Sequence, residues 1–247
     1  MNSTEAGSCV IFPIPLWVSA DDKSGFTYRA NLGQSVCVTG YVWYIEGAEE
    51  KILVDAGADA EYLCKVRGHE AYQIQTLESG LDKVGVSVSD IRLIIQTHLH
   101  ADHIVLASRF PKARILVQKD ELEFVRNPHC LFEDAYVKEF VRGLKLEVVE
   151  GDTQVSREIS VLLTPGHTPG SQSVSIKTEQ GTAIISGFCA IRENFGSPVG
   201  KMSSPVIAPA VHTNLFQAYD SMLRIKKEAD IIVPLHDPEF LAKSRIP

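Results

Sequence analysis

A cluster of metal-binding side chains directly follows an apolar run in this chain, and it limits the folds that the chain can adopt. Residues 92–96 have the composition of a buried strand, and residues 97–103 (THLHADH) come next. This segment holds three histidines and one aspartate within six residues. Because α/β proteins carry their chemistry at the carboxyl ends of strands, this position favours a functional site over a surface cluster.

The spacing of these four side chains suits metal ions. His98 and His100 can point to the same side, because alternate residues of an extended segment share a face. Asp102 and His103 follow after a turn and can reach a neighbouring point. One short segment of this kind can serve two adjacent metal ions.

Two further histidines lie far along the chain, at the ends of expected strands. His167 is part of TPGHTPG (residues 164–170), in which two Pro-Gly pairs predict a tight turn after a strand at residues 160–163. His236 follows an expected strand at residues 231–233 and stands between two prolines. We therefore expect both histidines to join the central cluster.

Together these side chains supply two sets of three ligands, each with an open position, and their chemistry suits zinc or iron. We expect the first set to be His98, His100 and His167, and the second to be Asp102, His103 and His236. Two metals about 3.5–4 Å apart can activate a shared water and polarise a carbonyl or phosphoryl oxygen.

Strand-like and helix-like segments alternate along both halves of the chain, which predicts one α/β domain over residues 1–247. The expected strands are residues 36–46, 51–55, 92–96, 114–118, 146–149, 160–163, 173–177, 183–186 and 231–233. The expected helices are residues 70–84, 119–126, 132–143 and 214–228. Residues 196–209 are rich in Pro, Gly and Ser, and we expect a loop over the substrate there.

The charge balance limits the partners of the protein. The formal net charge is −7, and the longest basic cluster is Arg224, Lys226 and Lys227. This disfavours nucleic acid and anionic membranes, which need a clustered positive face. We therefore expect a small-molecule substrate, with a homodimer as the commonest form among soluble oligomers.

Cysteine usage and hydropathy favour a cytoplasmic protein. The five cysteines are scattered and include no CxxC pair, which argues against a disulfide framework. No run approaches the roughly 20 apolar residues of a membrane span. The N-terminal segment lacks the basic start of a signal peptide, and Pro13 and Pro15 interrupt its apolar part.

The HxHxDH pattern at residues 98–103 resembles the signature of the metallo-β-lactamase superfamily. Residues 52–57 (ILVDAG) look like the early strand and turn of that family. Residues 162–176 (LLTPGHTPGSQSVSI), 192–195 (RENF) and 236–238 (HDP) are similar to N-acyl homoserine lactonases. The resemblance extends from about Val36 to Pro238. It implies a four-layer αβ/βα sandwich with the metal ions at one edge of two sheets.

The chain departs from this family where an aspartate usually bridges the two metals. Matching residues 193–195 to the lactonases puts Gly187 in the place of this aspartate. Matching Ser186 and Gly187 to the family's commoner Ser-Gly-Asp motif puts Phe188 there instead. The tyrosine that orients the substrate carbonyl in lactonases is also replaced, by Ala190 or Ile191.

Cys189 is the nearest residue that can bind a metal, and three alternatives remain for it. Its thiolate replaces the carboxylate and favours zinc or iron. Alternatively the bridge is lost and the protein works with one ion. In the third alternative Cys189 is a buried small hydrophobic residue.

The resemblance implies a metal-dependent hydrolase of a lactone or a related small acyl ester. Zinc, as one or two ions, or iron would lower the pKa of a bound water, which attacks the carbonyl. Asp102 would act as a ligand and as a proton acceptor. Apolar residues 206–211, with Phe195 and Met202, are candidates to line an acyl pocket.

Two other functions compete with lactone hydrolysis. The first is a single-metal member of the superfamily, with iron or zinc and with thioesterase, lyase or sulfur-oxygenase chemistry. The second is a non-catalytic protein that binds a small molecule, which the missing aspartate favours and the six intact ligands disfavour.

Overall fold

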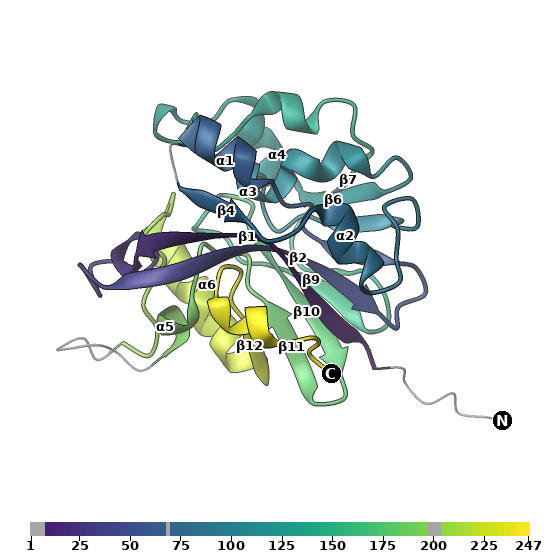
Figure 1. Ribbon diagram of the computed structural model, residues 1–247. Helices are drawn as coiled ribbons and strands as arrows, with labels where there is room; N and C mark the ends of the chain where they lie inside the picture. The colour runs from purple at the N-terminus through teal and green to yellow at the C-terminus, as the bar shows by residue number, and fades with distance from the viewer. Residues whose placement is uncertain (1–7, 68–69, 197–203) are drawn as a thin grey trace.

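Apolar and β-branched runs pair into two mixed sheets in the computed structural model, which describes residues 8–67, 70–196 and 204–247 (Figure 1). The larger sheet contains, in spatial order, β4 (Ala71–Gln73), β1 (Val10–Asp22), β2 (Ser35–Glu46), β3 (Ile52–Val54), β5 (Leu93–Ile95), β6 (Arg114–Gln118) and β7 (Leu146–Val149). The smaller sheet contains β12 (Ile231–Val233), β11 (Gly181–Ile185), β10 (Gln172–Thr178), β9 (Ile159–Leu163) and β8 (Thr153–Gln154).

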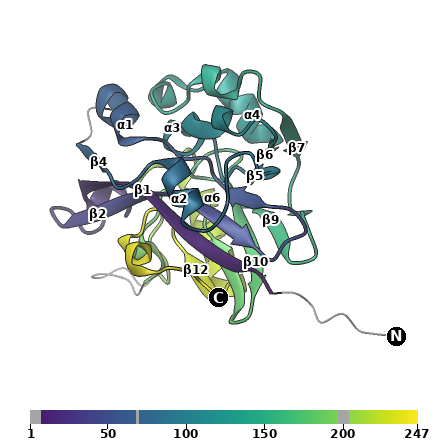
Figure 2. The same ribbon diagram turned by 45° about the vertical axis from the view of Figure 1, so that its right-hand side comes forward.

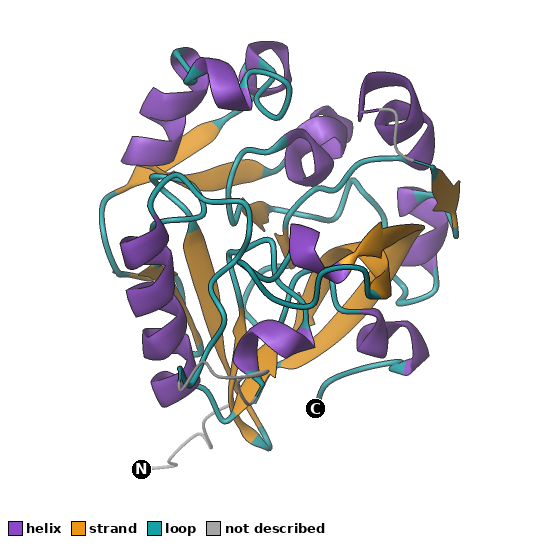
Figure 3. Cartoon of the chain, turned by 90° about the vertical axis from the view of Figure 1, so that its left-hand side faces the viewer, coloured by secondary structure: helices purple, strands orange, loops and turns teal. Residues whose placement is uncertain are grey.

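The helices lie outside the two sheets and complete four layers (Figures 1 and 2). They are α1 (Ala60–Arg67), α2 (Leu77–Asp82), α3 (Ala101–Ile104), α4 (Lys119–Arg126), α5 (Arg192–Phe195) and α6 (Leu215–Glu228). One core cluster joins the larger sheet to α1–α4, a second lies between the sheets, and a third joins the smaller sheet to α6. Figure 3 shows the strands between outer helices. The predicted sandwich is confirmed.

The expected strands begin only at residue 36, but the structure also forms β1, whose apolar run contains two prolines. It pairs with β2 over nearly its whole length, and Pro13 and Pro15 lie opposite Trp43 and Tyr41. On its other side β4 pairs only with residues 17–19. A proline removes a backbone donor, which an open stretch of strand tolerates. The prolines therefore lie where β1 has one neighbouring strand.

Two expected helices differ from the structure. Within residues 70–84, the first part forms β4, and α2 begins only after Thr76, whose side chain caps the amide of Ser79. In place of the expected helix at residues 132–143, a 3-10 turn at Cys130–Phe132 ends where that helix would begin, and a second follows at Lys138–Val141. Pairing with β1 and the local cap outweigh the helical spacing in the first case. In the described part of the chain, no helix is long and apolar enough to cross a membrane.

Strand direction brings the ends of several strands to one edge of the molecule. β3, β5 and β6 run parallel to one another in the larger sheet. In the smaller sheet β9 and β11 are both antiparallel to β10, and β12 is parallel to β11. The carboxyl ends of β9, β11 and β12 therefore lie on the same side, and each is followed by a segment with a candidate ligand.

Candidate metal centre

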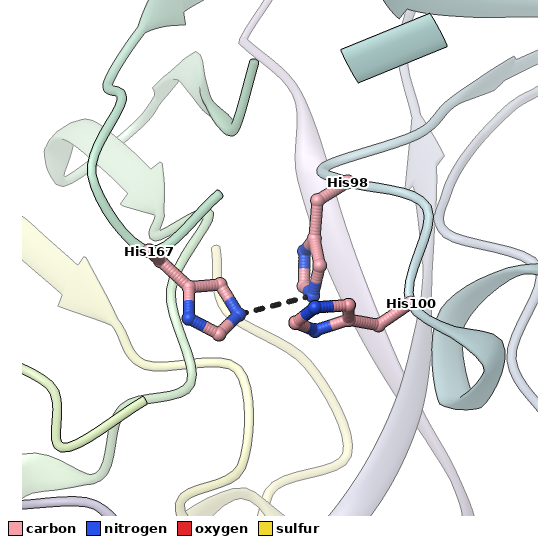
Figure 4. A group of neighbouring side chains, drawn as sticks. All are labelled: His98, His100 and His167. Atoms are coloured by element: carbon pink, nitrogen blue, oxygen red, sulfur yellow. Dashed lines mark hydrogen bonds between the residues drawn. The ribbon is translucent and has the colours of Figure 1, made fainter. Parts of the chain in front are cut away.

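Three buried histidines, on segments that follow strands of both sheets, converge on one point (Figure 4). His98 and His100 follow β5, and His167 follows β9. One ring nitrogen from each lies within 4.8 Å of the others. His98 and His167 are 69 residues apart in the chain, yet their Nε2 atoms are 3.3 Å apart. The structure therefore brings together the first set of side chains that the sequence predicts.

The hydrogen bonds of these rings show what the facing nitrogens can bind. Thr97 Oγ1 donates to Asp55, so it accepts from Nδ1 of His98 at 3.0 Å. Nδ1 of His167 donates to the carbonyl of Val211 at 2.8 Å. Each Nε2 therefore presents a lone pair, and two lone pairs at this distance repel unless a cation lies between them. The donor set fits a metal ion.

The protonation of the two rings agrees with this role. Burial and the neighbouring histidines hold the pKa of His98 well below its usual range. Burial lowers the pKa of His167 to about 4. Neutral imidazole is the form that binds a metal, so both rings are prepared as ligands at neutral pH.

The second predicted set also converges. Ligand atoms of Asp102, His103 and His236 lie within 4.8 Å of one another. Oδ2 of Asp102 is 3.2 Å from Nε2 of His103 and 3.9 Å from Nε2 of His236. Nδ1 of His236 is 3.1 Å from the carbonyl of Thr39 on β2, which directs Nε2 towards the site. This contact joins the two sheets.

His103 differs from the other rings in its electrostatics. Burial alone would lower its pKa, but the carboxylates of Asp102 and Asp55 outweigh burial and raise the pKa of His103 to about 10. Asp55 follows β3 and accepts from Nδ1 of His103 at 2.8 Å. A metal at Nε2 would therefore replace a proton on a ring already oriented by a carboxylate.

Glycines fix the segment that carries His167. Gly166 has a φ of +123°, and a Cβ there would lie 2.1 Å from the backbone nitrogen of Ala218 in α6. A Cβ at Gly170 would lie 2.2 Å from the backbone nitrogen of Glu121 in α4. Because only glycine permits both approaches, the TPGHTPG segment is held between two helices.

The three residues nearest to the place of the missing aspartate have different surroundings. A Cβ at Gly187 would lie 2.1 Å from the carbonyl oxygen of Gln172, so no side chain fits there. Phe188 is fully buried in the core cluster against α6. Cys189 lines the cavity at the metal centre, although it is not part of either set of three. All three alternatives for Cys189 stay predictions.

Two adjoining cavities give access to the candidate ligands. The smaller, of about 220 Å³, is lined by all six of them. The larger, of about 380 Å³, is lined by Trp17, Phe26, Val38 and Leu63 among others. Five residues line both cavities: Asp102, Asp134, Cys189, Val211 and His236. The metal centre therefore adjoins a larger and mainly apolar space.

The expected acyl-pocket residues divide in two. Val211 lines both cavities, whereas Phe195 and Val206 pack in the core against α6. Met202 and the middle of the expected lid, residues 197–203, lie outside the described residues. Most of the apolar wall comes instead from β1, β2 and α1, segments that carry no site signal in the sequence.

Two carboxylates that support the site, Asp55 and Glu121, are also absent from the site residues predicted from the sequence. Asp55 lies directly after a buried strand, and this position is a usable signal, since strand ends share an edge with the histidine segment. Glu121 is fully buried in the first turn of α4, within KDELEF. In sequence it cannot be distinguished from a surface glutamate.

Comparisons with known proteins agree with this geometry. The sequence profile described as the metallo-beta-lactamase superfamily matches residues 36–233. The chain is 34% identical to the N-acyl homoserine lactonase AiiA of Bacillus thuringiensis subsp. kurstaki over 170 residues, which are 67% of this chain and 64% of that protein. It is 29% identical to the N-acyl homoserine lactonase of Bacillus cereus over 197 residues, 72% of this chain and 75% of that protein.

A solved structure resembles the fold over nearly the whole chain. It is an N-acyl homoserine lactone hydrolase with the product N-hexanoyl-L-homoserine bound at the catalytic metal center. The TM-score is 0.75 at 28% identity, and the match covers 93% of this chain and 94% of that one. The sequence match to AiiA, by contrast, spans less than two thirds of that lactonase.

Proposed function

Because the chain belongs to the metallo-beta-lactamase superfamily, we propose that it is a metal-dependent hydrolase that opens the ring of a lactone with an apolar acyl substituent. The observation that carries this proposal is the convergence of six ligand side chains beside a larger, mainly apolar cavity. The similarity to N-acyl homoserine lactonases supports it.

We propose zinc as the metal, in one or two ions, with iron as the alternative. Five imidazoles and one carboxylate form the two sets of ligands, and imidazole suits both metals. Bound metal would supply the reaction with a water of lowered pKa and with polarisation of the carbonyl. The protein supplies orientation through the Nδ1 hydrogen bonds that direct Nε2 towards the site in His98, His103, His167 and His236.

The substrate would lie across both cavities. The lactone ring would occupy the space beside the six ligands, and the acyl substituent would extend along Trp17, Phe26 and Leu63. Burial of an apolar chain there contributes roughly 0.8 kcal/mol per methylene group.

Asp102 is the candidate catalytic residue because it lines both cavities and its Oδ2 lies 3.2 Å from Nε2 of His103, within the second set of ligands. Its carboxylate would accept the proton that water releases on attack at the carbonyl carbon. The same proton would pass to the alkoxide that leaves when the ring C–O bond breaks. No tyrosine is among the described residues that line either cavity, so the carbonyl must be oriented differently from the pattern implied by the lactonase resemblance.

The direct test is turnover of N-hexanoyl homoserine lactone, with ring opening followed by proton release. We expect turnover by the metal-loaded protein and none after treatment with a chelator. A thioester assayed under the same conditions serves as a comparison. Hydrolysis of the thioester alone would overturn the lactone assignment and favour another activity of the superfamily.

A further inference from the structure

Glu121 is a fully buried carboxylate that belongs to neither set of candidate ligands. It lies in the first turn of α4, close to the ligand segments that follow β5 and β9. A buried carboxylate is costly unless hydrogen bonds or charges compensate it.

Four donors saturate the carboxylate. Oε1 accepts from the amide of Leu99 at 2.8 Å and from the hydroxyl of Tyr136 at 2.7 Å. Oε2 accepts from the hydroxyl of Thr168 at 2.6 Å and from the amide of Gly170 at 3.1 Å. Each oxygen thus accepts from one amide and one hydroxyl.

These donors are the immediate neighbours of the first set of ligands. Leu99 lies between His98 and His100 in the chain, and Thr168 directly follows His167. The ring of Tyr136 lies edge-on against His100, with ring centroids 4.8 Å apart. Each of the three histidines therefore has a neighbouring residue that donates a hydrogen bond to this one carboxylate. The histidines lie on two segments, one after β5 in the larger sheet and one after β9 in the smaller sheet.

We propose that Glu121 is a positioning residue that holds His98, His100 and His167 in the geometry that binds one metal ion. The second set has its own support, from Asp55 at His103 and from the carbonyl of Thr39 at His236. Loss of Glu121 therefore weakens one metal position and spares the other. The inference rests on the proposed function only for the presence of metal.

The test is a cobalt(II) titration of the metal-free protein, followed by visible absorption. Glu121→Gln keeps the shape of the side chain but turns one acceptor oxygen into a donor that faces an amide and a hydroxyl. We expect this variant to keep its circular dichroism spectrum and to bind one cobalt equivalent about 10–100-fold more weakly. The affected equivalent should be the one that His167→Ala loses.

The matched control is Val125→Ala, one turn further along the same helix. Val125 is buried in the core, and its truncation weakens the packing of α4 without removing a hydrogen bond to the ligand segments. We expect it to bind cobalt like the wild type. The same loss of affinity in Val125→Ala, or wild-type binding by Glu121→Gln, would overturn the proposal.

If Glu121→Gln does not fold, Tyr136→Phe replaces it as the test. This change removes one donor and keeps the ring that packs against His100. We expect a several-fold loss at the same equivalent, and unchanged binding would contradict the proposal. A wild type that binds cobalt but opens no lactone would refute the proposed substrate and leave the role of Glu121 standing.

Discussion

The carboxylate of Asp55 joins the two ends of the HxHxDH segment, since it accepts from Nδ1 of His103 at 2.8 Å and from the amide of Thr97, next to His98, at 2.7 Å. Its second bond to Thr97, at 2.9 Å to the hydroxyl, orients the hydroxyl that accepts from His98. Asp55 has a φ of +60°, a left-handed conformation that aspartate and asparagine tolerate better than most residues.

Asp55→Asn tests this role, because asparagine suits the same backbone conformation and changes only the carboxylate. Its amide group would point a donor at a donor, leaving a buried hydrogen bond unmade. We expect metal affinity to fall about 10–100-fold and the free energy of unfolding to fall by about 1–3 kcal/mol. Cobalt titration and urea unfolding would measure the two effects. Unchanged affinity would show that His103 needs no such support.

Cys189→Ala distinguishes the alternatives for the missing bridging aspartate. We expect the metal content per chain to stay unchanged, because the two sets of three supply imidazole and carboxylate ligands without the sulfur. Elemental analysis by mass spectrometry of wild type and variant gives the answer. Loss of one equivalent in the variant would make Cys189 a ligand and would contradict this expectation.

Gly166→Ala should destabilise the protein strongly, since a Cβ there would lie 2.1 Å from the backbone of α6 and the φ of +123° disfavours it. We expect a loss of about 3 kcal/mol or more from overpacking and backbone strain. The matched control is Gly85→Ala, where φ is +71° and no described atom lies within 4 Å of the added Cβ. This change should cost only about 1–2 kcal/mol. Equal losses in urea unfolding would argue against the close packing on α6.

Leu63→Trp tests the assignment of the larger cavity to the acyl substituent. Leu63 lines that cavity but not the smaller one that contains the six ligands. The indole ring of tryptophan is larger than the leucine side chain and would fill space that a long acyl substituent needs. We expect the KM for an N-decanoyl lactone to rise about tenfold, the equivalent of roughly 1.4 kcal/mol, while an N-butanoyl lactone keeps its KM. A parallel rise for both substrates would place the acyl chain elsewhere.

The sequence predicts which candidate ligands converge because their signals are local. Three histidines and an aspartate within six residues need no tertiary information to be noticed, and the Pro-Gly turns mark His167. The structure brings both predicted sets together. The resemblance to the superfamily also predicts the four-layer fold, which the strand order and the comparisons confirm.

The features that the sequence does not reveal depend on tertiary contacts. β1 is a strand because β2 pairs with it despite two prolines, and its Trp17 becomes part of the cavity wall. Glu121 acquires its role only because α4 lies against both ligand segments. The placement of Cys189 at the cavity follows from the packing of Gly187 and Phe188, which no spacing rule predicts.

Ring opening of N-hexanoyl homoserine lactone should be measured before metal removal, after it, and after zinc is returned. We expect chelation to abolish turnover, and zinc to restore it in the wild type but not in His98→Ala. Turnover that survives in metal-free protein, or in zinc-loaded His98→Ala, would contradict the claim that the converging histidines hold the metal on which hydrolysis depends.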